Sequence, residues 1–360
     1  MIVMNTYRIH LRHKELRIRR CYLLTPRLVR VEDAIGHRLA HDVTMVTRDF
    51  KGAIFRRGHK VRTEDVEVLK RSGHYFVLIE DKSDEGVHED EAVISLARTI
   101  AGSGTYVVSA EEGKALIKSS VDKGIVKVNV KGLDMINSLG DFIVTTKRSY
   151  TLVNKDDVVG IIDLVPLIID KEKFENVLER ARIIAPVIEV KKPIKKRVGL
   201  VITGTEVYEG IIKDEATEVV KSKVEKYGVE IVRRHIVPDD LDKIKEALLN
   251  CIKVSDIVIA TGGMSVDPTD YTHKAIASVA TEVIIYGIPI KPNTMTMLAY
   301  RGNKPIIGVP GSIVYFRDWN VLDVLLPKLL IGEKWTREEL LKLAHGGISD
   351  YFLSRKKNWR

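Results

Sequence analysis

The chain has 360 residues, of which 45% are hydrophobic and 30% charged, and it contains two cysteines and no glutamine. This length is enough for two or three domains, and the composition is that of a soluble globular protein. No apolar run approaches the ~20 residues that cross a bilayer, which excludes membrane-spanning classes. Cys21 and Cys251 lack metal-ligand spacing, so a reduced, cytoplasmic setting is expected. The bias toward Lys, Arg, Glu, Ile and Val is common in thermophilic proteins.

The formal net charge of +9 is concentrated at the two ends of the chain. Residues 1–30 carry eight Lys or Arg and one acid, Glu15, and residues 351–360 carry four Lys or Arg and no acid. These ends contribute +7 and +4, which leaves −2 for the 320 residues between them. The folded domains are therefore not basic, and nucleic-acid binding is not expected of them.

Composition and turn signals divide the chain into five parts. Residues 1–28 lack a turn-bounded pattern, and we expect a basic, poorly ordered or loosely attached extension. The strand and helix patterns that follow predict a small β-rich, barrel-like domain and then an α+β region. The predicted units are 29–80 (small β-rich domain), 87–190 (α+β middle domain), 197–332 (α/β domain) and 333–360 (basic C-terminal tail).

Beyond Arg197 apolar strands alternate with amphipathic helices. The alternation predicts a three-layer α/β/α domain with a mostly parallel sheet between two helix layers. The expected strands are 198–203, 229–237, 257–261, 283–289 and 305–310, and the expected helices are 214–227, 239–251, 270–277 and 315–330.

Three predicted strands of this domain end in glycine-containing turns. In an α/β sheet the carboxyl ends of the strands face the ligand, and such turns offer free N–H groups to an oxyanion. Together they predict a site for a phosphorylated ligand, and their spacing matches neither a P-loop nor a dinucleotide fingerprint. The candidate ligand-binding residues are Thr203, Gly204 and Asp214 after the first strand, Thr261, Gly262, Gly263 and Ser265 after the third, and Pro310, Gly311 and Ser312 after the last.

Three carboxylates, Glu206, Asp267 and Asp270, lie close to these turns in sequence. Carboxylates beside a phosphate can hold a hydrated Mg²⁺, but Asp also caps helices and stabilises turns. For Asp267, which precedes a proline, the turn is favoured. Lys291 either meets an anion or is a solvated loop lysine, and His235 and His273 stand alone and are interpreted as structural.

Residues 197–332 resemble the molybdopterin-binding domain shared by MogA-type proteins, MoeA-type molybdotransferases and the gephyrin E-domain. The resemblance is carried by Thr203-Gly204, Glu206, Gly210, Asp214, Ser255-Asp256, Thr261-Gly262-Gly263, Ser265, Asp270, Lys291-Pro292 and Pro310-Gly311. Residues 29–80 are similar to the small barrel of MoeA-like proteins.

The resemblance implies a fold that holds molybdopterin or its adenylated form, takes up molybdate or tungstate, and cleaves the nucleotide with Mg²⁺. By position it implies catalytic roles for Glu206 and Asp270 and oxyanion contacts for Ser265 and Lys291. Asp270 is the implied metal-linked carboxylate, with Asp267 as a second candidate. A homodimer is also implied.

Two loops depart from the family pattern. The family's Lys-Pro-Gly-Lys-Pro is Lys291-Pro292-Asn293-Thr294-Met295 here, and its Pro-Gly-Asn-Pro-Val-Ser is Pro310-Gly311-Ser312-Ile313-Val314-Tyr315. A lysine and a serine that the resemblance links to molybdate are therefore absent. The alternatives are an active MoeA-like enzyme, a non-catalytic carrier or sensor of the cofactor, and a nucleotide or pyrophosphate hydrolase of the competence-damage type.

Overall fold

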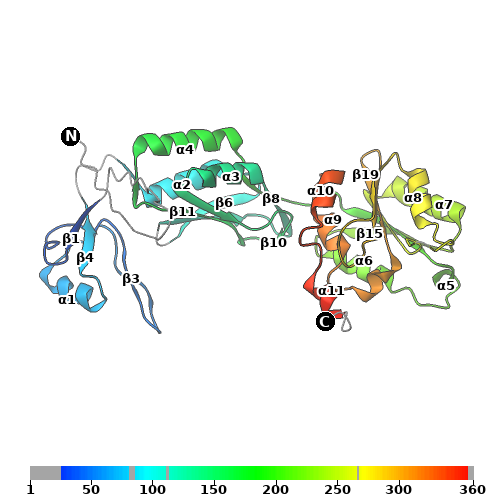
Figure 1. Ribbon diagram of the computed structural model, residues 1–360, viewed down its shortest axis with the longest axis horizontal. Coiled ribbons are helices and arrows are strands. Elements are labelled where there is room, and N and C mark those ends of the chain that lie inside the picture. The colour runs from blue at the N-terminus through cyan, green and yellow to red at the C-terminus, as the bar shows by residue number, and fades with distance from the viewer. Residues whose placement is uncertain (1–25, 81–85, 111–112, 266, 356–360) are drawn as a thin grey trace, which may run out of the picture.

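The computed structural model describes residues 26–80, 86–110, 113–265 and 267–355. Three folded regions follow one another along the long axis of the molecule, from the N-terminal region through a middle region to the α/β domain (Figure 1). Apart from residues 26–28, the predicted N-terminal extension lies outside the described residues. None of the helices in the described ranges has the length and apolar character needed to cross a membrane.

The N-terminal region is β-rich with one helix, as its sequence indicated. Its strands form two antiparallel pairs, β1 with β4 and β2 with β3, and not a closed barrel within the described residues. Val31, Leu39 and Leu69 are fully buried at its centre. The elements are β1 (Arg27–Arg30), β2 (Val43–Val46), β3 (Lys51–Phe55), α1 (Thr63–Arg71) and β4 (Phe76–Ile79).

The middle region is an α+β unit with its own core, as predicted. A four-stranded antiparallel sheet, β6-β7-β11-β9, lies against helices α2, α3 and α4 (Figure 1). Its elements are β5 (Val87–His88), α2 (Glu89–Ile100), β6 (Thr105–Ala110), β7 (Lys114–Ser119), β8 (Gly124–Val128), α3 (Val130–Ser138), β9 (Phe142–Thr146), β10 (Leu152–Val153), β11 (Val158–Leu164), β12 (Ile168–Ile169), α4 (Lys171–Ile184) and β13 (Ile188–Lys191).

The α/β domain contains a six-stranded sheet in the order β15-β14-β16-β19-β18-β17. The first four strands of this order are parallel, and the last two pair antiparallel, so the sheet is mostly parallel as expected. Its elements are β14 (Arg197–Thr203), α5 (Thr205–Tyr208), α6 (Ala216–Glu225), β15 (Glu230–Val237), α7 (Leu241–Val254), β16 (Ile257–Thr261), α8 (Thr272–Val279), β17 (Glu282–Tyr286), β18 (Met297–Arg301), β19 (Lys304–Val309), the 3₁₀ helix η1 (Gly311–Tyr315), α9 (Val321–Leu330), α10 (Arg337–Lys342) and α11 (Asp350–Arg355).

Alternate residues of the central strands point to opposite faces of this sheet. Leu200 and Ile202 of β14 join a buried cluster with residues of α6 and α9. Val201, between them, joins a second cluster with residues of α7 and α8. Both faces of the sheet are therefore covered, which explains the continuous apolar strands and confirms the three-layer architecture.

Strand β18 and helix α9 differ from the sequence prediction, and the short helix α5 was not predicted either. Strand β18 was not predicted, because Met297, Leu298 and Ala299 lack the β-branching of the other buried strands and favour helices, although the run is buried like theirs. The expected long helix 315–330 begins only at Val321. The Asn320 side chain accepts a hydrogen bond from the Leu322 N–H at 3.0 Å and caps α9, while residues 311–315 form η1.

The predicted C-terminal tail is wrong for residues 333–355, which fold onto the α/β domain. Trp335, Leu340 and Phe352 are buried, and the first two belong to the core cluster that contains α9. Helices α10 and α11 have only six residues each, too few to show a clear helical pattern. The basic residues around them therefore led to the prediction of a tail. The remaining residues of that tail, 356–360, lie outside the described chain.

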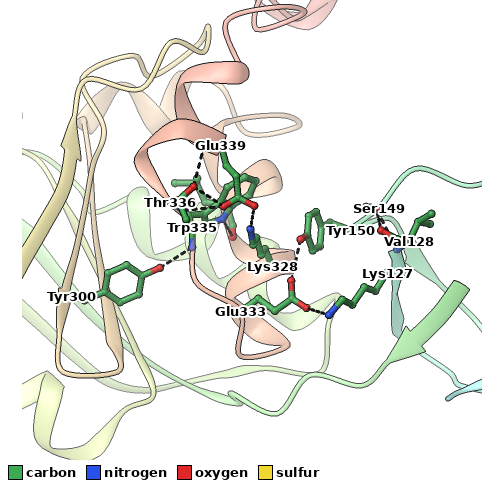
Figure 2. A network of polar contacts seen from close by, with 11 residues as sticks. Lys127, Val128, Ser149, Tyr150, Tyr300, Lys328, Glu333, Trp335, Thr336 and Glu339 are labelled. Carbon is green, nitrogen blue, oxygen red and sulfur yellow. Dashed lines mark hydrogen bonds and ion pairs between the residues drawn. The ribbon is translucent and has the colours of Figure 1, made fainter. Parts of the chain in front are cut away.

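Polar contacts join the middle region to the end of α9 (Figure 2). Glu333 accepts a hydrogen bond from the Tyr150 hydroxyl at 3.0 Å and pairs with Lys127 at 2.5 Å. Lys328, whose side chain is buried, pairs with Glu339 and lies 4.6 Å from the Trp335 ring centroid. The segment that follows α9 therefore contacts both the domain core and the middle region.

A buried ion pair fixes α6 against the start of α9. Asp323 accepts from Lys223 at 2.7 Å and from Lys226 at 2.6 Å, and the Lys223 side chain is only 5% exposed. Replacing Asp323 with Ala leaves the buried Lys223 ammonium with no carboxylate and only the Asp318 carbonyl, 2.8 Å away, as acceptor, so the free energy of unfolding should fall by about 3–5 kcal/mol. The measurement is urea unfolding followed by circular dichroism.

The matched control is Glu225→Ala, which breaks the exposed α6 pair between Lys221 and Glu225. Its effect should stay within about 0.5 kcal/mol, because surface pairs contribute little. Equal unfolding midpoints for Asp323→Ala and the control would contradict the buried-pair account.

Candidate functional site

A cavity of about 500 Å³ opens at the carboxyl ends of β16 and β19. This volume is within the range of small-molecule sites. Three loops and helix α11 form it; the loops are the turn after β16, the turn after β19, and the loop between β17 and β18. The lining residues are Gly263, Met264, Ser265, Asp270, Lys291, Pro292, Asn293, Thr294, Met295, Pro310, Gly311, Ser312, Phe316 and Phe352.

The turn after β16 depends on a glycine at position 262. Gly262 has φ of 101°, and a Cβ there would lie 2.2 Å from the Thr203 carbonyl oxygen and 2.6 Å from its Oγ1. Thr203 Oγ1 is itself 2.7 Å from the Thr272 hydroxyl at the start of α8. The absence of a side chain thus lets the end of β16 pass directly against the end of β14.

Asp270 closes this turn and faces the cavity. Its Oδ2 accepts a hydrogen bond from the Ser265 N–H at 2.5 Å, so the two residues are held together. The Tyr286 hydroxyl, nearby, donates to the Met264 carbonyl at 2.7 Å. Burial, and then the charge of Asp270, raise the pKa of Tyr286. The Asp270 carboxylate thus lines the cavity, and the Tyr286 hydroxyl lies behind it, bonded to the backbone of Met264.

The loop between β17 and β18 supplies the one cation among the cavity-lining residues. Lys291 is exposed, and its backbone is fixed to the C-terminal segment: its N–H donates to Gly347 O at 2.7 Å, and its carbonyl accepts from the Ser349 N–H at 3.2 Å. Opposite charges at Lys291 and Asp270 suit a ligand that carries both an anion and a cation or donor.

The cavity brings together seven of the predicted site residues. These are Gly263, Ser265, Asp270, Lys291, Pro310, Gly311 and Ser312. They come from two of the three glycine turns and from the lysine loop. The three loops follow β16, β19 and β17, whose carboxyl ends lie at the same edge of the sheet. This shared edge brings the seven residues together.

The remaining predicted residues lie outside the cavity lining. Thr203 and Thr261 are buried between strand ends, and Gly262 serves their close approach. Gly204 and Glu206 begin α5 after β14. Asp214 accepts from the Thr217 N–H at 3.0 Å and lies 3.4 Å from Arg234, so it caps α6.

Asp267 and the two histidines have local roles. Asp267 Oδ1 accepts from the Thr269 N–H at 3.0 Å and from its hydroxyl at 2.6 Å, a turn interaction that lowers its pKa. His273 stacks on Tyr286 with ring centroids 5.2 Å apart. His235 is on β15, away from the lining residues.

The cavity also contains residues that the sequence did not identify as site residues. Met264, Pro292, Asn293, Thr294, Met295, Phe316 and Phe352 line it as well. Phe352 comes from α11, in the segment expected to be a tail. Loop 291–295 was recognised as a unit, but only its lysine carried a chemical signal.

No group of three His, Cys, Asp or Glu side chains in the described residues is arranged to hold a metal ion. Mg²⁺ commonly uses only one or two carboxylates and takes its other ligands from water and substrate phosphates. Asp270, the one carboxylate in the cavity lining, fits that donor set. Asp267 fits it less well, because it is not among the residues that line the cavity.

Comparisons with known proteins agree with the sequence resemblance. Residues 199–330 match the family model described as "Probable molybdopterin binding domain", and residues 28–81 match one described as a domain of unknown function. A molybdopterin molybdenumtransferase of Staphylococcus aureus is 28% identical over 131 residues, and one of Staphylococcus epidermidis is 24% identical over 131 residues. Each alignment covers 34% of this chain and 31% of the relative, so the chain spans about a third of the length of these relatives.

Among solved structures, a tungsten cofactor synthesizing protein MoaB from Pyrococcus furiosus is 21% identical, with a TM-score of 0.34, and covers 38% of this chain and 94% of its own. A molybdopterin biosynthesis enzyme MoaB from Thermus thermophilus is 20% identical, with a TM-score of 0.33, over 39% of this chain and 99% of its own. The family match rests on the sequence model and the curated relatives. Residues 199–330 are therefore similar to the domain described as "Probable molybdopterin binding domain" and to part of the curated molybdenumtransferases.

Proposed function

We propose that the protein binds molybdopterin or its adenylated form in this cavity and acts in molybdenum cofactor biosynthesis in a MoeA-like role. The observation that carries the proposal is the cavity itself, where Ser265, Asp270 and Lys291 converge within the family-matched domain. A phosphate group would meet the Lys291 ammonium, the Ser265 and Ser312 hydroxyls, and N–H groups of the glycine turns. Asp270 would hold a Mg²⁺, which would supply positive charge to stabilise the phosphate.

Pterin binding has stronger support than metal insertion. The lysine expected second in loop 291–295 is replaced by Thr294, whose hydroxyl donates to Ile290 O at 2.9 Å. Tyr315 replaces the family serine, and it is 72% exposed at the end of η1. Neither residue supplies a charged group for an oxyanion such as molybdate or tungstate. A non-catalytic carrier or sensor of the cofactor is therefore the second candidate function.

Catalytic roles are proposed for Asp270 and, secondarily, for Glu206. Asp270 lines the cavity, whereas Glu206 stands at the end of the adjacent strand β14. Glu206 would act only on a ligand that extends past the cavity along the carboxyl edge of the sheet.

A homodimer and a cytoplasmic setting are also proposed. The homodimer rests on the resemblance to MoeA-type proteins, and light scattering of the purified protein tests it. The cytoplasmic setting rests on cysteine usage: Cys251 is a buried free thiol, and burial raises its pKa to about 11, which makes it unreactive.

Mass spectrometry of small molecules released from the purified protein should detect molybdopterin or its adenylate.

Lys291→Ala should raise the dissociation constant of that ligand about 10- to 100-fold in calorimetry, because a charged hydrogen bond to phosphate contributes about 1.5–3 kcal/mol. Lys342→Ala, a charge-matched change on exposed α10, should leave affinity unchanged. A wild-type protein that binds neither molecule would exclude the proposed function.

Asp270→Asn tests the metal-linked role. Asn can still accept the Ser265 N–H bond but loses the charge, so Mg²⁺-dependent release of AMP from adenylated molybdopterin should fall by at least about 100-fold, the size of losing one charge-stabilising group. Release is measured by chromatography of AMP. Asp267→Asn should retain the activity. If AMP release were instead lost in Asp267→Asn and kept in Asp270→Asn, Asp267 would be the metal ligand. Absence of AMP release from the wild type, with binding intact, would select the carrier function.

A further inference from the structure

One buried polar group in the cavity lacks a partner. Asn293 is 6% exposed, and its Nδ2 donates to the Ser312 Oγ at 3.2 Å. Its Oδ1 is buried and has no hydrogen-bond partner among the residues that the structure describes. Buried amide oxygens are almost always paired, so an unpaired one at the lining of a cavity indicates an acceptor for a ligand donor.

The Asn293 side chain is positioned by its backbone. Asn293 has φ of 73°, a left-handed conformation that Asn tolerates better than most residues. Its carbonyl accepts from the buried Thr296 hydroxyl at 2.7 Å. The family pattern has glycine at this place, so the amide is a feature of this chain and not of the shared loop.

An aromatic wall stands in the same cavity. Phe316, which follows η1, and Phe352, on α11, both line it, with ring centroids 5.7 Å apart and an interplanar angle of 44°. Tyr351 meets Phe316 edge-on at 6.4 Å. Such a cluster offers planar, polarisable surface on which a heterocycle can stack.

The C-terminal segment holds this wall against the lysine loop. Ser349 Oγ donates to the Lys291 carbonyl at 3.1 Å, and the backbone of Lys291 forms a bridge with Ile348. The segment lies beyond residues 199–330, which match the family domain. Phe352 is thus an addition to the domain's site that is fixed in place by the residues leading to α11.

We propose that Asn293, Phe316 and Phe352 form a subsite for an amino-substituted planar heterocycle, with Asn293 Oδ1 accepting a hydrogen bond from the ring's amine or N–H. The proposal rests on the proposed function and deepens it by assigning the ring-binding end of the cavity. Lys291 and Ser265 serve the phosphate end. Two rings share this chemistry, the pterin and the adenine of an adenylated ligand, and separate probes distinguish them.

The test is calorimetric titration of the full chain with neopterin and, separately, with AMP. The wild type should bind one of them, and which one binds identifies the ring. Asn293→Gly, which suits the left-handed backbone, should weaken that probe about 5- to 10-fold. Asn293→Asp, which keeps the acceptor, should weaken it less than Asn293→Gly. Equal losses in both variants would overturn the acceptor role.

Phe352→Ala should weaken the same probe about 5- to 100-fold, the range of ring stacking on an aromatic side chain. Leu353→Ala, its partly exposed neighbour on α11, is the matched control and should leave binding unchanged. Melting temperatures of both variants check that α11 remains folded, and Phe316→Leu supplies a second variant in which α11 is untouched. Undiminished binding in Phe352→Ala and Phe316→Leu would overturn the subsite.

The outcomes separate this proposal from the proposed function. A wild type that co-purifies with molybdopterin but binds neither probe, or binds them equally well in all variants, overturns the subsite and leaves the function standing. A wild type that retains no molybdopterin and binds neither probe overturns both.

Discussion

The site depends on the close approach of two strand ends. The turn at Gly262 passes so near the Thr203 carbonyl that a single added carbon would lie 2.2 Å from it. This contact sets the path of residues 263–265, and Asp270 then fixes that path by accepting the Ser265 N–H. Backbone N–H groups can bind a ligand only if the backbone is fixed by something other than hydrogen bonds from those same groups. Packing of a glycine against a neighbouring strand fixes the backbone in this way.

The features that the sequence predicted correctly are local ones. Apolar five- to seven-residue runs separated by amphipathic helices are enough to indicate a parallel sheet covered on both faces. The Thr-Gly-Gly turn after β16 was recognisable for the same reason, because the backbone geometry it requires is encoded in adjacent residues. The β-rich and α+β character of the first two regions followed from similar patterns.

The features that could not be predicted are set by contacts between distant residues. Phe352 reaches the cavity only because the chain turns back across α9 and bonds to the backbone of Lys291. Asp214 and Asp270 both follow glycine-containing turns, yet only Asp270 faces the cavity, since Asp214 caps α6. Sequence spacing cannot distinguish a capping carboxylate from a ligand-facing one when both stand beside a turn.

The segment after α9 links the ligand site to the rest of the molecule. Near its start Glu333 bonds to Tyr150 and Lys127 of the middle region (Figure 2). Near its end Ser349 donates to the Lys291 carbonyl, and Phe352 lines the cavity. Trp335, buried between these two points, donates its N–H to the Tyr300 hydroxyl and its Nε1–H to Leu325 O. The contacts of Trp335 hold the segment against the domain core between its contact with the middle region and its contact with the lysine loop. One continuous segment, which lies outside residues 199–330, thus contacts both the middle region and the ligand site.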